Sequence, residues 1–368
     1  MRSKLSKQDA TLALMQVPGI GKILYSRLVE RFSSPQEVWN SSASDLQSIK
    51  SLPPKAIKNI LEGPDIEAVE RLKKRLDLMD GWFLTMHDAE FPPNLLNISQ
   101  VPPVLFGLGE KDVLGLKSVA IVGSRKASTY GKRVAREIAS GLCQRGWTVV
   151  SGLALGIDSA AHEGALSGGG PTVAVKGCGL DVVYPARNRE LEAKIAENGA
   201  VITEFFPGTQ PEPGNFPTRN RIISGLGRAI IVVEAGPKSG SLITAYLGME
   251  QGKDIMAVPG NIYSYNSIGC HELIRQGAAL VSSIEEIMEE LGEFFFEKGF
   301  AQSQDTVKVS SLSEDEQCVV DKLEAEPQHI DDIAAHCGLP VALVNSLLVR
   351  LELKGLVVSQ PGSKYSIR

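Results

Sequence analysis

Between residues 118 and 258, short runs of β-branched and aliphatic residues alternate with helical stretches, and this alternation constrains the fold more than any other feature. A loop and a helix follow each run. Continuous apolar strands with helices between them are typical of a parallel sheet that helices cover on both faces. The sequence therefore predicts an α/β fold with a doubly wound parallel sheet. The predicted strands are Val119–Val122, Trp147–Val150, Thr172–Val175, Val201–Thr203, Ile230–Val233 and Ile255–Val258.

The first 80 residues predict a small helical module. Short amphipathic stretches are separated by turns, and Val17-Pro18-Gly19-Ile20-Gly21-Lys22 lies between two of them. This turn resembles the hairpin of a helix-hairpin-helix module, in which glycine amides at a helix N-terminus hold a DNA phosphate. A plain turn between two helices explains the same residues, because few basic residues follow it. Both interpretations stay open.

Two further regions flank the predicted sheet. The extended segments Trp82–Thr85 and Val104–Gly107 are expected to add an edge strand. After the sheet, Ser313 is a predicted helix N-cap, and two helices at Ile330–Cys337 and Val341–Lys354 with a two-strand ending follow the order of a winged helix. The predicted divisions are 1–80 for the helical module, 81–291 for the α/β domain, 292–312 for a linker and 313–368 for the winged helix.

Composition narrows the classes of function. The 368 residues suffice for two or three domains, and a formal net charge of −5 means that any nucleic-acid surface is a local patch. Five cysteines and five histidines are scattered without CxxC pairing or metal-ligand spacing, which favours reduced thiols and no metal site. The start lacks an apolar signal segment, and no uncharged run reaches membrane-spanning length. The sequence therefore predicts a cytoplasmic protein with no membrane association.

Small and polar residues follow the predicted strands. In a parallel α/β sheet, ligands bind where the strands end and lead into helices. Gly123-Ser124-Arg125-Lys126 follows the first strand, and Gly236 to Ser241, with Lys238, Ser239 and Ser241, precedes a later helix. Amides, hydroxyls and cations in such turns suit an anion. Any one glycine turn is explained equally well by the needs of a tight turn, but several at one edge predict anion binding.

The stretch from Asn215 to Ile223 carries one aromatic ring, two guanidinium groups and one amide. Because Pro211, Pro213 and Gly214 precede it, we expect a loop rather than a helix. Arginine suits phosphate and phenylalanine offers a face to a base, so Phe216, Arg219, Asn220 and Arg221 are candidate ligand residues. The alternative is a surface loop whose arginines pair with carboxylates. One arginine is a candidate to anchor to Glu204 or Glu234 while the other meets a phosphate.

Catalytic signatures are missing from the sequence. The loop from Gly236 to Ser241 is not a Walker A loop, and Gly123-Ser124-Arg125 is not a GxGxxG fingerprint. No serine nucleophile elbow and no Cys/His pairing are present. Four polar residues at the sheet edge are more simply explained as supports of a site than as catalytic groups: Asp158, His162, Glu204 and Glu234. Asp158 and His162 are four residues apart on one helix, where they are able to pair with each other.

Six segments, in this order, resemble the DNA-processing protein A family (DprA, also called Smf). The resemblance spans roughly residues 102–287, and the helical N-terminal module and the C-terminal winged helix fit the family's arrangement less specifically. The segments are Ala120–Arg125, Ser151–His162, Gly177–Pro185, Phe216–Ile223, Ser239–Ala245 and Ala257–Gly260.

The resemblance implies an extended Rossmann-like domain at 81–291 that binds single-stranded DNA, forms a homodimer and helps to load the RecA recombinase during natural transformation. It implies no catalytic role, no cofactor and no metal. The family's DNA pocket carries over here to Gly123, Ser124, Arg125, Phe216, Arg219, Asn220 and Arg221. Lys238, Ser239 and Ser241 join this set as much through the phosphate-loop argument as through the match.

Two positions depart from the family pattern, and the charge of the C-terminal segment is a separate observation. His271 stands where Asn is usual, and Lys176 stands where an aliphatic residue is common; Lys176 either adds charge to the pocket or extends elsewhere. The C-terminal segment 311–368 has five Lys/Arg against nine Asp/Glu, a net charge of −4. That balance suits duplex phosphates poorly, so we expect a protein-contact or regulatory module.

Two other classes of function remain as alternatives. One is a nucleotide-binding or nucleotide-hydrolysing enzyme of the related lysine-decarboxylase-like Rossmann group. Those enzymes use a PGGxGT loop and a catalytic glutamate, and Gly236 to Ser241 lacks that pattern. The other is a pure protein-interaction scaffold, which has no need of the Arg/Phe stretch.

Overall fold

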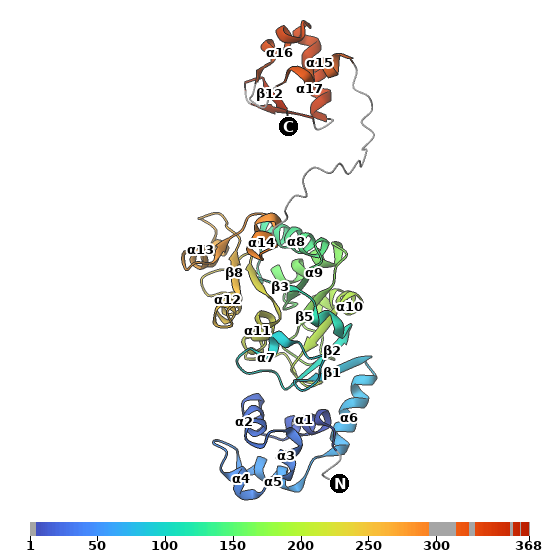
Figure 1. Cartoon of the computed structure of the whole chain (residues 1–368), viewed down its shortest axis with the longest axis vertical. Coiled ribbons are helices and arrows are strands. Elements are labelled where there is room, and N and C mark those ends of the chain that lie inside the picture. The colour runs from blue at the N-terminus through green and yellow to red at the C-terminus, as the bar shows by residue number, and fades with distance from the viewer. Residues whose placement is uncertain (1–4, 294–313, 324–327, 354–355, 361, 368) are drawn as a thin grey trace. The chain divides into compact units, whose positions relative to one another are not determined.

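The computed structural model describes residues 5–293, 314–323, 328–353, 356–360 and 362–367 (Figure 1). The chain separates into two compact units, Met1–Phe295 and Phe296–Arg368. Ser313 and nearly all of the predicted linker at 292–312 lie outside the described residues, so the predicted N-cap and linker remain predictions.

Six helices form the start of the first unit. They are α1 (Lys7–Gln16), α2 (Lys22–Phe32), α3 (Pro35–Asn40), α4 (Ala43–Gln47), α5 (Pro54–Glu62) and α6 (Ile66–Asp77). The turn between α1 and α2 contains Gly19 with φ of 93°, a backbone conformation that glycine adopts without strain. Leu12, Leu14 and Leu28 of this module share one buried cluster with Phe106 and Val201 of the sheet. The helices therefore pack on the sheet rather than standing apart from it.

A nine-stranded sheet follows, in the order β1-β2-β6-β5-β4-β3-β7-β8-β9. The first two strands run antiparallel to their neighbours, and the rest are parallel. The predicted parallel α/β sheet is confirmed, and the connector supplies two strands instead of one. The bounds are β1 (Gly81–Thr85), β2 (Val104–Gly109), β3 (Ser118–Val122), β4 (Thr148–Ser151), β5 (Thr172–Val175), β6 (Ala200–Thr203), β7 (Ala229–Val232), β8 (Asp254–Ala257) and β9 (Ala279–Leu280).

The strand order reverses between β3 and β7, which are hydrogen-bonded neighbours although three strands separate them in the chain. The chain winds from β3 through β4 and β5 to β6 on one side, and then returns to β7 on the other side of β3. Such a reversal leaves a crevice beyond the carboxyl ends of the two strands, because their loops turn to opposite faces. The loops after β3 and β7 therefore border the expected ligand position.

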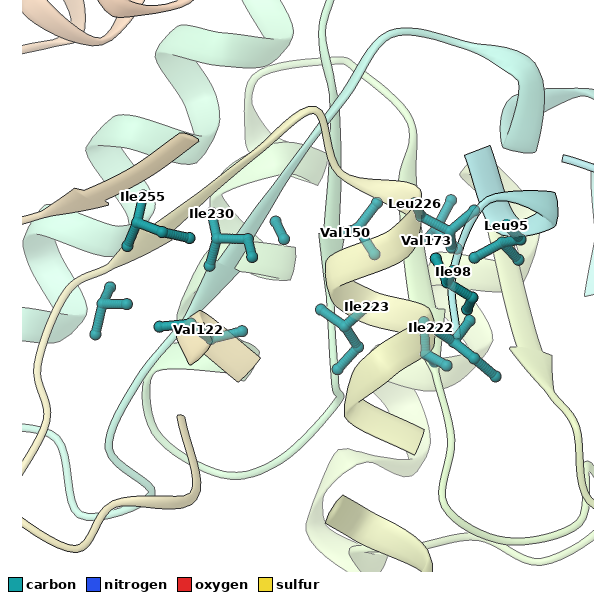
Figure 2. Close-up of a cluster of buried hydrophobic side chains, with 14 of the residues drawn as sticks. Leu95, Ile98, Val122, Val150, Val173, Ile222, Ile223, Leu226, Ile230 and Ile255 are labelled. Atoms are coloured by element: carbon teal, nitrogen blue, oxygen red, sulfur yellow. The ribbon is translucent and has the colours of Figure 1, made fainter. Parts of the chain in front are cut away.

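Helices cover both faces of the sheet. On one face lie α8 (Thr129–Gln144), α9 (Ile157–Ser167), α10 (Arg189–Asn198) and α14 (Ile284–Glu290). On the other lie α7 (Pro93–Leu96), α11 (Asn215–Leu226), α12 (Gly240–Glu250) and α13 (Ile268–Arg275). In Figure 2, Ile222, Ile223 and Leu226 of α11 lie among Val150 and Val173 of the strands and Leu95 and Ile98 of the α7 segment. Short 3-10 turns occur at Lys111–Gly115, Ala186–Asn188 and Tyr265–Ser267.

The stretch from Asn215 is a helix, and the prediction of a loop there was wrong. The approach through residues 207–214 is irregular as expected, but α11 begins at Asn215 and carries Phe216, Arg219 and Arg221. Pro217 is the third residue of the helix. A proline is tolerated in the first turn, because its missing N–H has no intrahelical partner there and its φ is already helical.

The second unit has the element order of a winged helix. Its elements are α15 (Glu314–Lys322), β10 (Gln328–His329), α16 (Ile330–Cys337), α17 (Val341–Leu353), β11 (Val357–Gln360) and β12 (Lys364–Ile367). The strands form a sheet in the order β10-β12-β11, of which the short β10 was not predicted. Ile333, Val344, Leu348 and Leu351 are buried in its core. Among the described residues no single helix is long and apolar enough to cross a membrane; only α16 and α17 taken together meet that test, and they are bent by 106°.

Candidate functional site

A cleft of about 670 Å³ lies at the carboxyl edge of the sheet. Its walls come from the loops after β3 and β7, the first turns of α11, and the N-terminus of α12. The predicted site residues that line it are Gly123, Ser124, Arg125, Phe216, Arg219, Asn220, Lys238, Ser239 and Ser241. Of the predicted set, only Arg221 is not among the lining residues. The structure thus gathers residues from the loops after β3 and β7 and from the starts of α11 and α12 into one concave surface.

Three cations of the cleft are exposed. Arg125, Lys126 and Lys238 all line it, and none of them forms an ion pair with a carboxylate of the described residues. Exposed cations without a local counter-charge remain available to an anionic ligand. Arg136, in contrast, is an exposed cation of this unit that is paired with Glu163.

Two aromatic rings stand beside Arg125. The ring of Phe216 lies 5.5 Å from that of Tyr184, between centroids, and the Arg125 guanidinium carbon lies 5.2 Å from the Phe216 centroid. Phe216 also packs on Gly177, where an added Cβ would come within 2.9 Å of its Cδ1. A cation beside an exposed aromatic face is a common arrangement for holding a base and its phosphate.

The N-terminus of α12 faces the cleft. Ser239 caps this helix by accepting a hydrogen bond from the Ser241 amide, and the two hydroxyls lie 2.8 Å apart. Asn220 donates to the Gly240 carbonyl oxygen at 3.3 Å and so ties α11 to the start of α12. Amides at a helix N-terminus carry partial positive charge, which favours an anion.

Gly123 and Ser124 also have structural duties. A Cβ on Gly123 would lie 2.6 Å from Ile157 Cγ1 and 2.9 Å from the Glu234 carbonyl oxygen, so close packing of the β3 and β7 loops requires glycine here. The Ser124 amide donates to that same carbonyl at 2.7 Å. For these two residues, the simple structural explanation of the glycine turn therefore holds alongside any contact with a ligand.

Arg219 lies at the floor of the cleft with only 4% of its surface exposed. Its Nη1 donates to the carbonyl oxygens of Gly152, at 2.7 Å, and Val175. The neighbouring Asp158 is also buried, and burial raises the pKa of its carboxyl to about 6 although Arg219 acts to lower it. Arg219 thus holds the ends of β4 and β5 together and adds positive charge from below.

His162 does not pair with Asp158. Its Nδ1 hydrogen bonds to the Thr172 hydroxyl at 2.7 Å, in a fully buried position. Burial, followed by the nearby charge of Arg219, lowers the pKa of His162 to about 3. The imidazole is therefore neutral at physiological pH and packs within the core.

Arg221 points away from the cleft and is held by Glu204. Its two Nη atoms donate to the two carboxylate oxygens at 2.8 and 2.6 Å, and its Nε donates to the Gln100 carbonyl oxygen at 3.0 Å. Lys22 of α2 approaches the same carboxylate at 3.7 Å. With 5% of its surface exposed, Arg221 is the anchoring arginine of the pair that the sequence could not separate.

Glu234 and Lys176 are also engaged by the protein. The Glu234 carboxylate accepts from the Ser128 amide at 2.9 Å and from its hydroxyl, at the start of α8. Lys176 is 2% exposed; it donates to Glu192 at 2.5 Å and to the Leu180 carbonyl oxygen at 3.1 Å. Lys176 therefore extends away from the cleft and brings no free charge to it.

The cleft residues that were not among the predicted site residues include Lys126, Tyr184, Tyr265 and Asn266. Lys126 and Tyr184 belong to segments that the sequence singled out, so adjacency to Arg125 and to Pro185 was a usable signal. Tyr265 and Asn266 come from the segment after β8, and no local sequence pattern indicates that this segment returns to the cleft. His271, which departs from the family pattern, bonds through Nε2 to the Gly260 backbone at 3.1 Å. Within the described residues, no group of three or more His, Cys, Asp or Glu side chains is placed to hold a metal ion.

Comparison with known proteins identifies the chain's relatives. The family model described as DNA recombination-mediator protein A matches residues 82–292, and a DprA winged helix domain model matches residues 304–363. Protein Smf of Synechocystis is 35% identical over 99% of both chains. The crystal structure of DNA processing protein A from Streptococcus pneumoniae is similar, with a TM-score of 0.69, 35% identity, and coverage of 80% of this chain and 99% of that one. A DprA structure from Helicobacter pylori, described for its single-stranded DNA binding mode, has a TM-score of 0.53, 30% identity, and coverage of 57% and 96%.

Proposed function

The chain belongs to the DNA recombination-mediator protein A family, and from this premise we propose that its cleft binds single-stranded DNA. One observation carries the proposal: the cleft combines exposed cations that form no ion pair among the described residues with two neighbouring aromatic rings, the half-buried Phe216 and the exposed Tyr184. The Helicobacter pylori relative, which is described as binding single-stranded DNA, supports it.

In this proposal, different residues of the cleft contact the phosphates and the bases. Arg125, Lys126 and Lys238 hold phosphates, with the start of α12 adding amides and hydroxyls. Phe216, flanked by Tyr184, stacks a base without strong sequence preference, because every base has an aromatic face. Arg219 contributes charge from the floor. Arg221 serves by anchoring α11, so its contribution to binding is indirect.

The cleft is proposed as a binding site and not as a catalytic one. A nucleotide-hydrolysing enzyme of the alternative class requires a carboxylate that is free to act on a substrate. Glu204 is occupied by Arg221, and Glu234 by the Ser128 cap. Asp158, which does line the cleft, is buried beside Arg219. This favours binding over the nucleotide-hydrolysing alternative.

The wider role follows from the family. We propose that the chain acts in DNA processing as a cytoplasmic homodimer, protects incoming DNA and helps to load the RecA recombinase during natural transformation, with no cofactor. We also propose that residues 1–80, 81–291 and 313–368 are a helical module, a DNA-binding domain and a protein-contact domain. The net charge of −4 over residues 311–368 supports the last assignment.

Fluorescence anisotropy tests the proposal. Labelled oligo-dT and a duplex of equal length are titrated at several salt concentrations. We expect clear preference for the single strand, and an affinity that falls with salt. In the Arg125→Ala/Lys238→Ala variant the salt slope should flatten by about 0.7 for each lost phosphate contact. Arg136→Ala is the control for loss of a positive charge outside the cleft, because Arg136 is exposed but paired with Glu163 and does not line the cleft. Equal binding by the wild type and the double variant would place the DNA elsewhere.

A further inference from the structure

Tyr265 is an exposed aromatic residue at a part of the cleft wall distinct from Phe216. It opens the short turn Tyr265–Ser267 after β8, lines the cleft, and has 65% of its surface exposed. Its ring packs on Gly236, where an added Cβ would lie 2.4 Å from Tyr265 Cε1. Gly236 lies in the loop after β7, which also carries Lys238. The cleft therefore has a second exposed aromatic ring, packed against the loop of Lys238.

The backbone around Tyr265 is held in place. The neighbouring Asn266 donates through Nδ2 to the Lys126 carbonyl oxygen at 3.0 Å, and its own carbonyl oxygen accepts from the Ala235 amide at 2.7 Å. Tyr130 donates to the Pro259 carbonyl oxygen at 3.3 Å, at the start of the same segment. The ring thus belongs to a segment that is hydrogen-bonded to the loops after β3 and β7, where the strand order reverses. Such preorganisation reduces the entropy cost of binding.

Both aromatic residues belong to parts of the cleft that carry exposed cations. Arg125 lies over Phe216, whereas Lys126 and Lys238 belong to the two loops against which the Tyr265 turn is held. One stacking ring with one cation suffices for a single nucleotide. Two aromatic rings and three exposed cations in one cleft match a strand whose consecutive bases and phosphates are presented together.

We propose that Tyr265 is a second base-stacking position, so that single-stranded DNA crosses the cleft from Phe216 to Tyr265 while its backbone contacts the intervening cations. This inference rests on the proposed function and deepens it. The ligand class becomes an unpaired oligonucleotide, because a mononucleotide has only one base to stack and a duplex hides its base faces. The strand gains affinity when it becomes long enough to reach both rings.

Length-dependent binding tests the inference. Anisotropy and competition titrations use thymidine monophosphate and a ladder of dT oligonucleotides. For Tyr265→Ala we expect a loss of roughly 5- to 150-fold on the longer oligonucleotides, which corresponds to one stacked base. The monophosphate should bind this variant as it binds the wild type. Tyr265→Phe should keep the wild-type affinity, because the ring is kept.

The neighbouring Tyr263 provides the control. It is 89% exposed and does not line the cleft, so Tyr263→Ala should bind all oligonucleotides normally. Tyr265→Trp supplies a second readout, since stacking of a base on the new indole should quench its fluorescence on the longer oligonucleotides but not with the monophosphate.

The outcomes separate this inference from the proposed function. If the wild type binds no single-stranded DNA, both are overturned. If the wild type binds but Tyr265→Ala binds every oligonucleotide equally well, the second position is wrong and the cleft assignment stands. An equal loss for the monophosphate and the longer oligonucleotides would also overturn the second position, because it would make Tyr265 part of the first. A loss in Tyr265→Phe equal to that in Tyr265→Ala would assign the effect to the hydroxyl and exclude stacking.

Discussion

Two groups of cations in the first unit differ in their burial and in their ion pairing. Arg125, Lys126 and Lys238 are exposed around the cleft without ion pairs among the described residues. Arg221 is buried against Glu204, which also receives Lys22. The exposed cations are available to a ligand, whereas the buried Arg221 is neutralised by its ion pair with Glu204. The role of a cation here follows from its partner and its burial, not from its motif.

Within one turn, helix α11 directs one arginine to the cleft and the other to a buried carboxylate. Arg219 and Arg221 are two residues apart, so their side chains leave the helix about 200° apart. Arg219 reaches the floor of the cleft, and Arg221 turns to the opposite side and meets Glu204. A loop would have allowed both to face one ligand. The helix forbids it.

The largest effect expected from this comparison is on stability. Arg221→Ala leaves the Glu204 carboxylate buried with only Lys22 near it, which should lower the free energy of unfolding by about 3–5 kcal/mol. Urea denaturation measures this loss. Arg221→Met combined with Glu204→Leu is the control, and it should recover much of the stability because the buried guanidinium and carboxylate are removed together, and only the partly exposed Lys22 loses its partner. If Arg221→Ala kept its stability but lost affinity for single-stranded DNA, Arg221 would belong with the cleft group.

A second effect concerns the buried groups beneath the cleft and depends on pH. The pKa of His162 falls to about 3 on folding, so its stabilising contribution is complete above its unfolded pKa of about 6.5 and is lost as the pH falls. Between pH 6.5 and 5 the loss should be about 2 kcal/mol. The raised pKa of Asp158 acts with opposite sign between about pH 4 and 6.

Comparison with His162→Gln isolates the histidine, because the Asp158 contribution is common to both proteins. Urea denaturation at pH 6.5 and 5 should show that the difference in unfolding free energy between wild type and variant shrinks on acidification. A constant difference would mean that His162 is accessible to protons in the folded state.

A third effect concerns Phe216, the aromatic neighbour of Arg125, and it should change binding more than stability. Phe216→Ala should weaken single-stranded DNA binding by about 1–3 kcal/mol, the worth of one stacked base. The salt slope should stay the same, because no phosphate contact is removed. Salt-dependent anisotropy checks both expectations. A flattened slope would show that Phe216 acts mainly by positioning Arg125.

The smallest effect is expected at the edge of the buried network. Lys22 lies 3.7 Å from Glu204 and retains some exposure, whereas Arg221 satisfies both oxygens of the carboxylate. Lys22→Ala should therefore cost less than about 1 kcal/mol in unfolding free energy. Urea denaturation beside Arg221→Ala measures the ratio. A cost as large as that of Arg221→Ala would show that Lys22 and Arg221 support Glu204 equally.

Much of the fold was predictable because it depends on local periodicity. The six apolar runs, each followed by a loop and a helix, led to the prediction of the parallel sheet. The error at Asn215 has a local cause: prolines and a glycine upstream are typical of loops, but Pro217 falls in the one turn of a helix that accepts it. The order of the strands, with its reversal between β3 and β7, is not contained in any single segment.

The sequence by itself determined which residue types reach the carboxyl edge of the sheet, because strand ends and glycine turns can be located from spacing alone. Only the tertiary structure decided which of them are free. Arg221 meets Glu204 across 17 residues, and Tyr265 returns to the cleft from beyond β8. These outcomes depend on contacts between distant segments, and burial and partner choice at such contacts settle whether a charge serves the fold or remains available to a ligand.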